Sequence, residues 1–187
     1  IQSREFLAHL LEFSGVWPAL MATEGYDPTS KQIIFDENIY NSDEQDWVGG
    51  KEGAPTFLDT YKEYRRNVLG LKYDRSMGFL RISVSHMSPE FSKEFADLII
   101  SEINETMRLH DLEKTNEYLD YLTKELETTK YMEVKSAMNN ILESQLIKKM
   151  ESMISKEYIL RVLAAPFLPE ERISPWRSGI SMLFSFL

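Results

Sequence analysis

The chain has 187 residues, of which 43% are hydrophobic and 12% are aromatic, so it is long enough to bury the core of one folded domain. Thirty acidic residues against twenty-one basic residues give a net charge of −9, which disfavours binding to nucleic-acid phosphates, and we expect no nucleic-acid partner. The sequence contains no cysteine, which excludes disulfides, thiolate zinc sites and a cysteine nucleophile.

The N-terminal third is predicted to contain two helices separated by a loop. Residues 1–13 place apolar side chains at near-helical spacing, and because the chain opens inside this helix without a methionine, we expect a longer parent protein. Residues 36–53 are acidic and contain three glycines, which is typical of a solvated loop. Pro55 then opens a helix that extends to about residue 67, since proline is tolerated in a first helical turn.

The periodicity changes after this second helix. Turn-forming residues 74–78 precede a segment in which Leu80, Ile82 and Val84 alternate with polar residues. An apolar residue at every second position is typical of a half-buried strand. We therefore predict a β-hairpin, or at least one strand, in this region.

A very long helical segment comes next. Ser88 is a favourable N-cap and Pro89 a favourable first helical residue, and neither glycine nor proline then occurs until Pro166. We predict a helix from Pro89 to about residue 128, which would be about 60 Å long at 1.5 Å per residue. A bend at residues 128–129 would precede a second helix, which continues to about residue 156.

Residues 158–164 alternate in polarity again, and we predict that they form a strand paired with the strand near Ile82. The charged residues of the long helices are expected to solvate an exposed face. The apolar stripe of such a long helix cannot be buried against a small domain, so it needs a returning helix or neighbouring copies, and we expect homo-oligomers. The residues predicted to pack the helices or the oligomer are Leu112, Leu119, Leu122 and Leu126.

No pattern of catalytic or metal-binding residues is evident. His9, His86 and His110 lie on different predicted elements without metal-ligand spacing, and we expect no metal or cofactor. The acidic residues of the loop at 36–53 could supply the paired carboxylates of a glycan-cleaving enzyme, but a flexible loop does not hold two carboxylates at a fixed separation. Asn104 opens a glycosylation pattern inside the predicted long helix, which makes modification there improbable. We expect no enzymatic activity.

The C-terminal region combines prolines with an apolar tail. Residues 178–187 are uncharged but too few to cross a bilayer, which needs about 20 residues. They are either the start of a spanning helix or a segment that packs on its own domain. Aromatic and cationic residues at a headgroup boundary favour the first alternative. The residues of this predicted membrane approach are Pro166, Pro169, Pro175, Trp176 and Arg177.

Three stretches of the chain resemble one protein family. Residues 1–7 (IQSREFL), 55–104 (PTFLDTYKEYRRNVLGLKYDRSMGFLRISVSHMSPEFSKEFADLIISEIN) and 142–177 (LESQLIKKMESMISKEYILRVLAAPFLPEERISPWR) are similar to the periplasmic region of polysaccharide co-polymerases, the Wzz-type chain-length determinants. The order of features carries the likeness: a strand, Ser-Pro-Glu opening a long helix, a Glu-Ser-Gln-Leu helix, a short strand and a proline-rich segment.

The resemblance implies an α+β fold in one periplasmic domain. Residues 1–87 and 157–177 would form a membrane-proximal α/β base with a small mixed sheet, residues 88–156 a protruding helical hairpin arm, and residues 178–187 the start of a second transmembrane helix. The prolines would fix the angle at which the domain stands on this anchor.

The implied function is the control of the modal chain length of O-antigen lipopolysaccharide or a related glycan. The protein would form a ring in the bacterial inner membrane and act with a polysaccharide polymerase and the growing glycan. The alternative is the periplasmic sensor or adaptor part of a tyrosine kinase for capsule or exopolysaccharide export, because such relatives share this region. A nucleotide-binding domain beyond residue 187 would distinguish the alternative.

Overall fold

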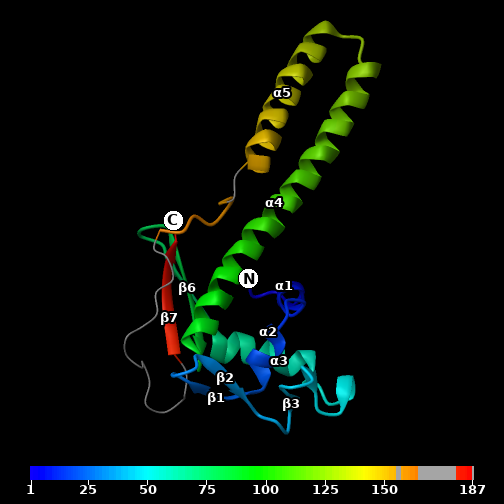
Figure 1. Ribbon diagram of the computed structural model, residues 1–187. Coiled ribbons are helices and arrows are strands. Elements are labelled where there is room, and N and C mark those ends of the chain that lie inside the picture. The colour runs from blue at the N-terminus through cyan, green and yellow to red at the C-terminus, as the bar shows by residue number, and fades with distance from the viewer. Residues whose placement is uncertain (155–156, 164–179, 187) are drawn as a thin grey trace. The chain divides into compact units, whose positions relative to one another are not determined.

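The computed structural model describes residues 1–154, 157–163 and 180–186, the last of these as backbone only. Two compact units divide the chain. Unit 1 comprises residues 1–100 and 162–187, and unit 2 comprises residues 101–161. Helices and small sheets are both present, so the predicted α+β class is confirmed at that level (Figure 1).

Unit 1 begins with two short helices, α1 (Arg4–Leu10) and α2 (Val16–Met21). Ser3 caps α1, because its hydroxyl oxygen accepts a hydrogen bond of 3.1 Å from the amide of Phe6. Gly15 separates the helices with a φ of 80°, a left-handed conformation that glycine adopts without strain. The first helix was predicted, whereas α2 was not.

Two small hairpins follow, neither of which the sequence analysis predicted. Strands β1 (Thr23–Asp27) and β2 (Gln32–Phe35) are antiparallel, and the carboxylate of Asp27 accepts hydrogen bonds from Thr29 and Ser30 in the connecting turn. Strands β3 (Tyr40–Asn41) and β4 (Asp46–Trp47) form the second hairpin, which precedes the 3-10 helix η1 (Gly50–Glu52).

The expectation of a wholly solvated loop over residues 36–53 is therefore wrong. The ring of Trp47 lies edge-on to those of Tyr40 and Trp17, with centroids 5.4 Å apart in both pairs. Aromatic contacts of this kind stabilise a short hairpin in spite of the acidic residues around it.

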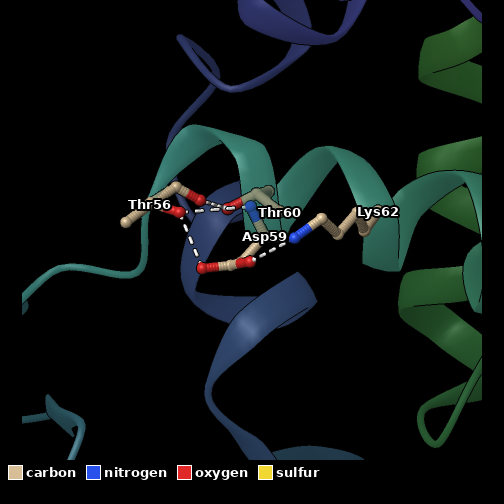
Figure 2. Close-up of polar contacts among 4 residues, drawn as sticks. All are labelled: Thr56, Asp59, Thr60 and Lys62. Atoms are coloured by element: carbon tan, nitrogen blue, oxygen red, sulfur yellow. Dashed lines mark hydrogen bonds and ion pairs between the residues drawn. The ribbon is translucent and has the colours of Figure 1, made fainter.

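Helix α3 (Phe57–Glu63) occupies the position predicted for the second helix, and a π-helical turn, η2 (Tyr64–Val68), extends it. Figure 2 shows how its first turn is capped: the hydroxyl of Thr56 donates to Asp59 at 2.7 Å and accepts from the Asp59 amide at 3.2 Å. The Nζ atom of Lys62 lies 3.1 Å from Oδ1 of Asp59, the carboxylate oxygen that Thr56 does not contact. The hydrogen bond from Thr56, followed by the interaction with Lys62, lowers the pKa of Asp59.

The main sheet has the strand order β5–β6–β7 and is antiparallel throughout. Strands β5 (Leu69–Asp74) and β6 (Phe79–His86) form the predicted hairpin. The third strand, β7 (Ile180–Phe186), pairs with β6 so that Phe184 is opposite Ile82. The prediction of a mixed sheet is wrong, because the hairpin and the returning strand both run antiparallel to β6.

The identity of the third strand was also predicted wrongly. Residues 157–163 form only a single bridge at Val162, and β7 takes the place beside β6 that was assigned to residues 158–164. Residues 180–186 have strand backbone and pair with β6, which agrees with the alternative of a segment that packs on its own domain rather than with the start of a spanning helix. The physical reason is visible in the sequence, since serines at 181 and 185 alternate with the apolar residues of this segment. Within the described parts of the chain, no helix is both long and apolar enough to cross a membrane.

Helix α4 (Pro89–Thr128) has the bounds that the sequence predicted. The hydroxyl oxygen of Ser88 accepts a hydrogen bond of 3.1 Å from the amide of Phe91, which confirms Ser88 as the N-cap. The first three turns of α4 contribute to the core of unit 1, and the rest of the helix belongs to unit 2. Buried core side chains of unit 1 include Leu7, Leu10, Tyr64, Ile82, Val84, Phe95 and Ile99.

Unit 2 is a helical hairpin, defined here as residues 101–161. The later part of α4 and helix α5 (Met132–Ile154) run antiparallel in it (Figure 1). Helix α4 ends at Thr128, where the bend was predicted. The apolar stripe of the long helix was predicted to need either a returning helix or neighbouring copies, and the structure shows a returning helix.

Candidate functional site

Among the described residues, no group of three or more histidine or acidic side chains is placed to hold a metal ion. The buried histidine, His86, is fully engaged in unit 1. Its Nε2 lies 2.8 Å from the carbonyl oxygen of Ala19, and its Nδ1 accepts a hydrogen bond of 3.1 Å from the amide of Ser88. Burial lowers the pKa of His86, which favours the neutral ring that these two contacts require. His86 therefore fastens the end of β6 to α2.

The helical hairpin is the candidate functional site, and its helices meet along a line of half-buried positions that we name the seam. The four leucines predicted from the sequence are all half-buried on one face of α4, with steps of seven, three and four residues. On α5, the half-buried Met138, Leu142 and Gln145 follow one another with steps of four and three. The four seam leucines of α4 are Leu112, Leu119, Leu122 and Leu126. Their role in assembly stays a prediction.

The seam is only partly apolar. Thr115 and Gln145 lie half-buried in it, and Ser152 is buried. A cavity of about 410 Å³ in the hairpin is lined mainly by polar side chains of α4 and α5, among them Asp111 and Lys148. Polar side chains in such positions supply little hydrophobic stabilisation, so the seam alone holds the two helices weakly.

A set of hydrogen bonds around Asn104, which we call the Asn104 cluster, closes the open end of the hairpin. The side chain of Asn104 is only 5% exposed, and its Nδ2 donates to the carbonyl oxygen of Leu160 at 3.0 Å. Its Oδ1 accepts from the amides of Ile159 and Leu160 at 3.0 and 2.8 Å. Next to it, the hydroxyl of Tyr158 donates to Asp111 at 2.9 Å, a bond that raises the pKa of Tyr158.

The Asn104 cluster ties residues 158–160 to α4 within unit 2. The cluster also shows why the glycosylation pattern that starts at Asn104 is not a modification site. A buried side-chain amide that makes three hydrogen bonds is not accessible to modification. The sequence analysis gave that pattern no weight, and the burial agrees with this interpretation.

Helix α5 carries a second apolar line that does not belong to the seam. Its members follow the spacing i, i+1, i+4, i+7 and i+8, which places them on one side of the helix. Their exposed fractions range from 42% at Leu146 to 81% at Ile154. A run of large apolar side chains open to solvent is typical of an interaction surface. We call this surface the α5 stripe: Leu146, Ile147, Met150, Met153 and Ile154.

Sequence reasoning missed the difference between the two lines. It predicted a second helix without assigning its apolar residues to separate faces, whereas the structure places Met138 and Leu142 in the half-buried seam and Leu146 and Met150 in the exposed stripe. The adjacent apolar pair at 146–147, repeated at 153–154, is the signal that could have revealed two lines. The predicted membrane approach, with Pro166, Pro169, Pro175, Trp176 and Arg177, lies outside the described residues.

In comparisons with protein families, curated proteins and solved structures, the chain has no match. We therefore base a functional proposal on the residues of the chain and on the geometry of the hairpin.

Proposed function

We propose that the chain is the periplasmic part of an oligomeric inner-membrane protein that sets the modal chain length of a cell-surface polysaccharide, O-antigen lipopolysaccharide or a related glycan. The protein acts as a co-polymerase beside the polymerase that extends the glycan. It contributes surfaces and spacing rather than catalytic groups. This proposal rests on the residue patterns that resemble chain-length determinants and on the exposure of the hairpin.

The exposed apolar surface of the hairpin carries the proposal. Among the described residues of unit 2, Leu160 is the only large apolar side chain that is buried. An isolated helical pair without a hydrophobic core is marginally stable in water, because most helical stability in proteins comes from packing an apolar face. The large apolar side chains that are more than one-third exposed among the described residues of the hairpin are Leu109, Tyr118, Tyr121, Tyr131, Met132, Val134, Ile141, Leu146, Ile147, Met150, Met153, Ile154 and Ile159.

Neighbouring copies of the same chain supply the missing cover. The α5 stripe of one protomer lies on a different surface from the seam, so each hairpin has one face for its own return and another for a neighbour. Contacts between two different faces of identical subunits are heterologous, and they close into a ring when the rotation allows. A ring of hairpins presents one surface many times to a polymerase or to a glycan.

The order of elements supports the choice of this class of function. The Ser88-Pro89-Glu90 segment opens a helix of 40 residues, and the Glu-Ser-Gln-Leu segment at 143–146 lies in the returning helix α5. These are two of the five features that carry the resemblance to chain-length determinants, and a third, the short strand after the second helix, is reduced to a single bridge at Val162. In such an assembly, chain length follows from the dimensions of the ring and from the number of surfaces that hold the glycan.

Deletion of the gene for the full-length protein tests the proposal. We expect electrophoresis of the extracted surface polysaccharide to show a ladder without its modal cluster, because the polymerase then stops without a length reference. Expression of the wild-type gene from a plasmid should restore the cluster. A ladder that is the same in the deletion strain, the complemented strain and the parent would contradict the proposed function.

A further inference from the structure

Unit 1 contains a groove of about 710 Å³ that the scaffold function does not use. Helix α2, strand β2 and the first three turns of α4 line it, together with the residues that join α1 to α2. All of these segments belong to unit 1. The volume lies within the range of about 300 to 1,000 Å³ that is typical of small-molecule sites in proteins.

Most of the groove is apolar and aromatic. Phe91 is half-buried in its wall and stacks on the buried Phe95, with ring centroids 5.3 Å apart and an interplanar angle of 13°. Phe91 also contacts the ring of His86, with ring centroids 4.5 Å apart and an interplanar angle of 55°. The hydrogen bonds of His86 hold that ring in place, so Phe91 is supported in a fixed orientation. Val16 and Ile33 add aliphatic surface to the lining.

A carboxylate in the groove lacks part of its hydrogen bonding. The hydroxyl of Tyr26 bonds to the carboxylate of Glu90, an interaction that raises the pKa of Tyr26 to about 12. The Oε2 atom of Glu90 is shielded from solvent and has no hydrogen-bond partner in the described chain. A shielded carboxylate oxygen without a donor is unfavourable, and a positive charge in the groove stabilises this carboxylate without contacting that atom.

The charges around the groove favour a cation. Glu94 lies one helical turn after Glu90 and also lines the groove, so two carboxylates face it from the same side of α4. Lys31, an exposed residue of the lining, is the one cationic side chain among the lining residues. The two acidic side chains thus outnumber the basic one, which attracts ligands of positive charge.

We infer that this groove binds a small organic cation with an apolar body, whose ammonium group lies beside the carboxylates of Glu90 and Glu94 while the body lies against Phe91. Charge selects the ammonium end, and the aromatic and aliphatic wall selects the body. The site belongs to unit 1 alone and does not depend on assembly or on the proposed control of chain length.

Binding of 2-phenylethylammonium to the purified chain, followed by NMR at pH 7, tests the inference. We expect saturable shifts in residues 88–98 at ligand concentrations up to about 10 mM, with 2-phenylethanol binding at least about tenfold more weakly because it lacks the charge. Ethylammonium, which has no aromatic body, should bind more weakly as well.

Glu90→Gln keeps the shape of the side chain and removes its charge, and we expect it to weaken binding of 2-phenylethylammonium at least about tenfold. Glu24→Gln is the matched control, since Glu24 is an exposed acid of β1 that does not line the groove. Phe91→Leu tests the wall independently and should weaken the aromatic ligand more than ethylammonium.

Circular dichroism establishes that each variant is folded. Equal affinity of wild-type and Glu90→Gln protein for the amine, equal binding of the amine and the alcohol, or no saturable shift in residues 88–98 would each overturn the inference.

Discussion

Replacement of Asn104 by alanine tests how the helical hairpin is closed. The amide and the carbonyl oxygen of Leu160 both lose their partner, and at 8% exposure this residue has little access to water. The amide of Ile159 also loses its partner, but that residue is 46% exposed and its amide can bond to water. Two orphaned buried groups at about 1 to 1.5 kcal/mol each amount to about 2 to 3 kcal/mol of local stability.

Amide hydrogen exchange measures this loss directly. A change of about 2 to 3 kcal/mol corresponds to about 30- to 150-fold faster exchange at Leu160, because each 1.4 kcal/mol is a factor of ten. Asn116→Ala is the matched control, since Asn116 is exposed on the same helix, and it should leave exchange at Leu160 unchanged. Exchange at Leu160 that is equally fast in wild-type and Asn104→Ala protein would refute the view that this side chain ties residues 158–160 to α4.

Two further predictions concern the seam and the buried histidine. Leu119→Glu combined with Leu126→Glu places two charges at half-buried seam positions. We expect this double variant to change the oligomer mass and the glycan length distribution while unit 1 stays folded. An unchanged glycan ladder together with an unchanged oligomer mass would contradict a role of the seam leucines in assembly. Burial places the pKa of His86 in the folded protein below its ordinary value of 6.5, so below pH 6.5 the unfolded chain binds more protons than the folded protein. The free energy of unfolding therefore falls as the pH falls below 6.5, by up to about 1.4 kcal/mol per pH unit. His86→Gln should flatten the dependence of unfolding free energy on pH between 7 and 5, whereas replacement of the exposed His110 by glutamine should not. Equal slopes in wild-type and His86→Gln protein would disprove that burial of His86 causes the pH dependence.

The elements that the sequence predicts well are those determined by neighbouring residues. Helix α4 could be placed at both ends because Ser88 and Pro89 provide a local start signal and because Thr128 and Thr129 are weak helix formers in a segment without glycine or proline. The β5–β6 hairpin was predicted for the same reason, from its turn residues and its alternation. The β1–β2 hairpin has a comparable turn signal at Asp27, which the sequence analysis did not use.

The partner of β6 could not be predicted because it depends on a contact between distant parts of the chain. Residues 158–164 and 180–186 both alternate in polarity, and either could pair with β6 on pattern alone. The apolar composition of the C-terminal segment led to the interpretation as the start of a membrane span. Its two serines, which support a strand, were not taken into account.

The candidate sites show the same division. The heptad-like spacing identified the seam leucines of α4. An apolar pattern on a helix does not say which of its residues the returning helix covers. Met150 and Ile154 were therefore not recognised as members of an exposed stripe. The groove in unit 1 depends on the positions of α2, β2 and the first turns of α4, which are far apart in the sequence. No spacing in the sequence predicts such an arrangement.

The mass of the full-length protein in detergent tests most directly whether the exposed α5 stripe assembles the hairpins. Met150→Glu with Ile154→Glu places two charges on the stripe, at positions 63% and 81% exposed, where the fold of a single chain tolerates them. Asn140→Glu with Ser144→Glu adds the same charges at the same i, i+4 spacing on α5, outside the stripe. We predict a ring-sized mass for wild-type and control protein and a several-fold smaller mass for the stripe variant. A stripe variant that keeps the mass of the wild-type assembly would contradict the account.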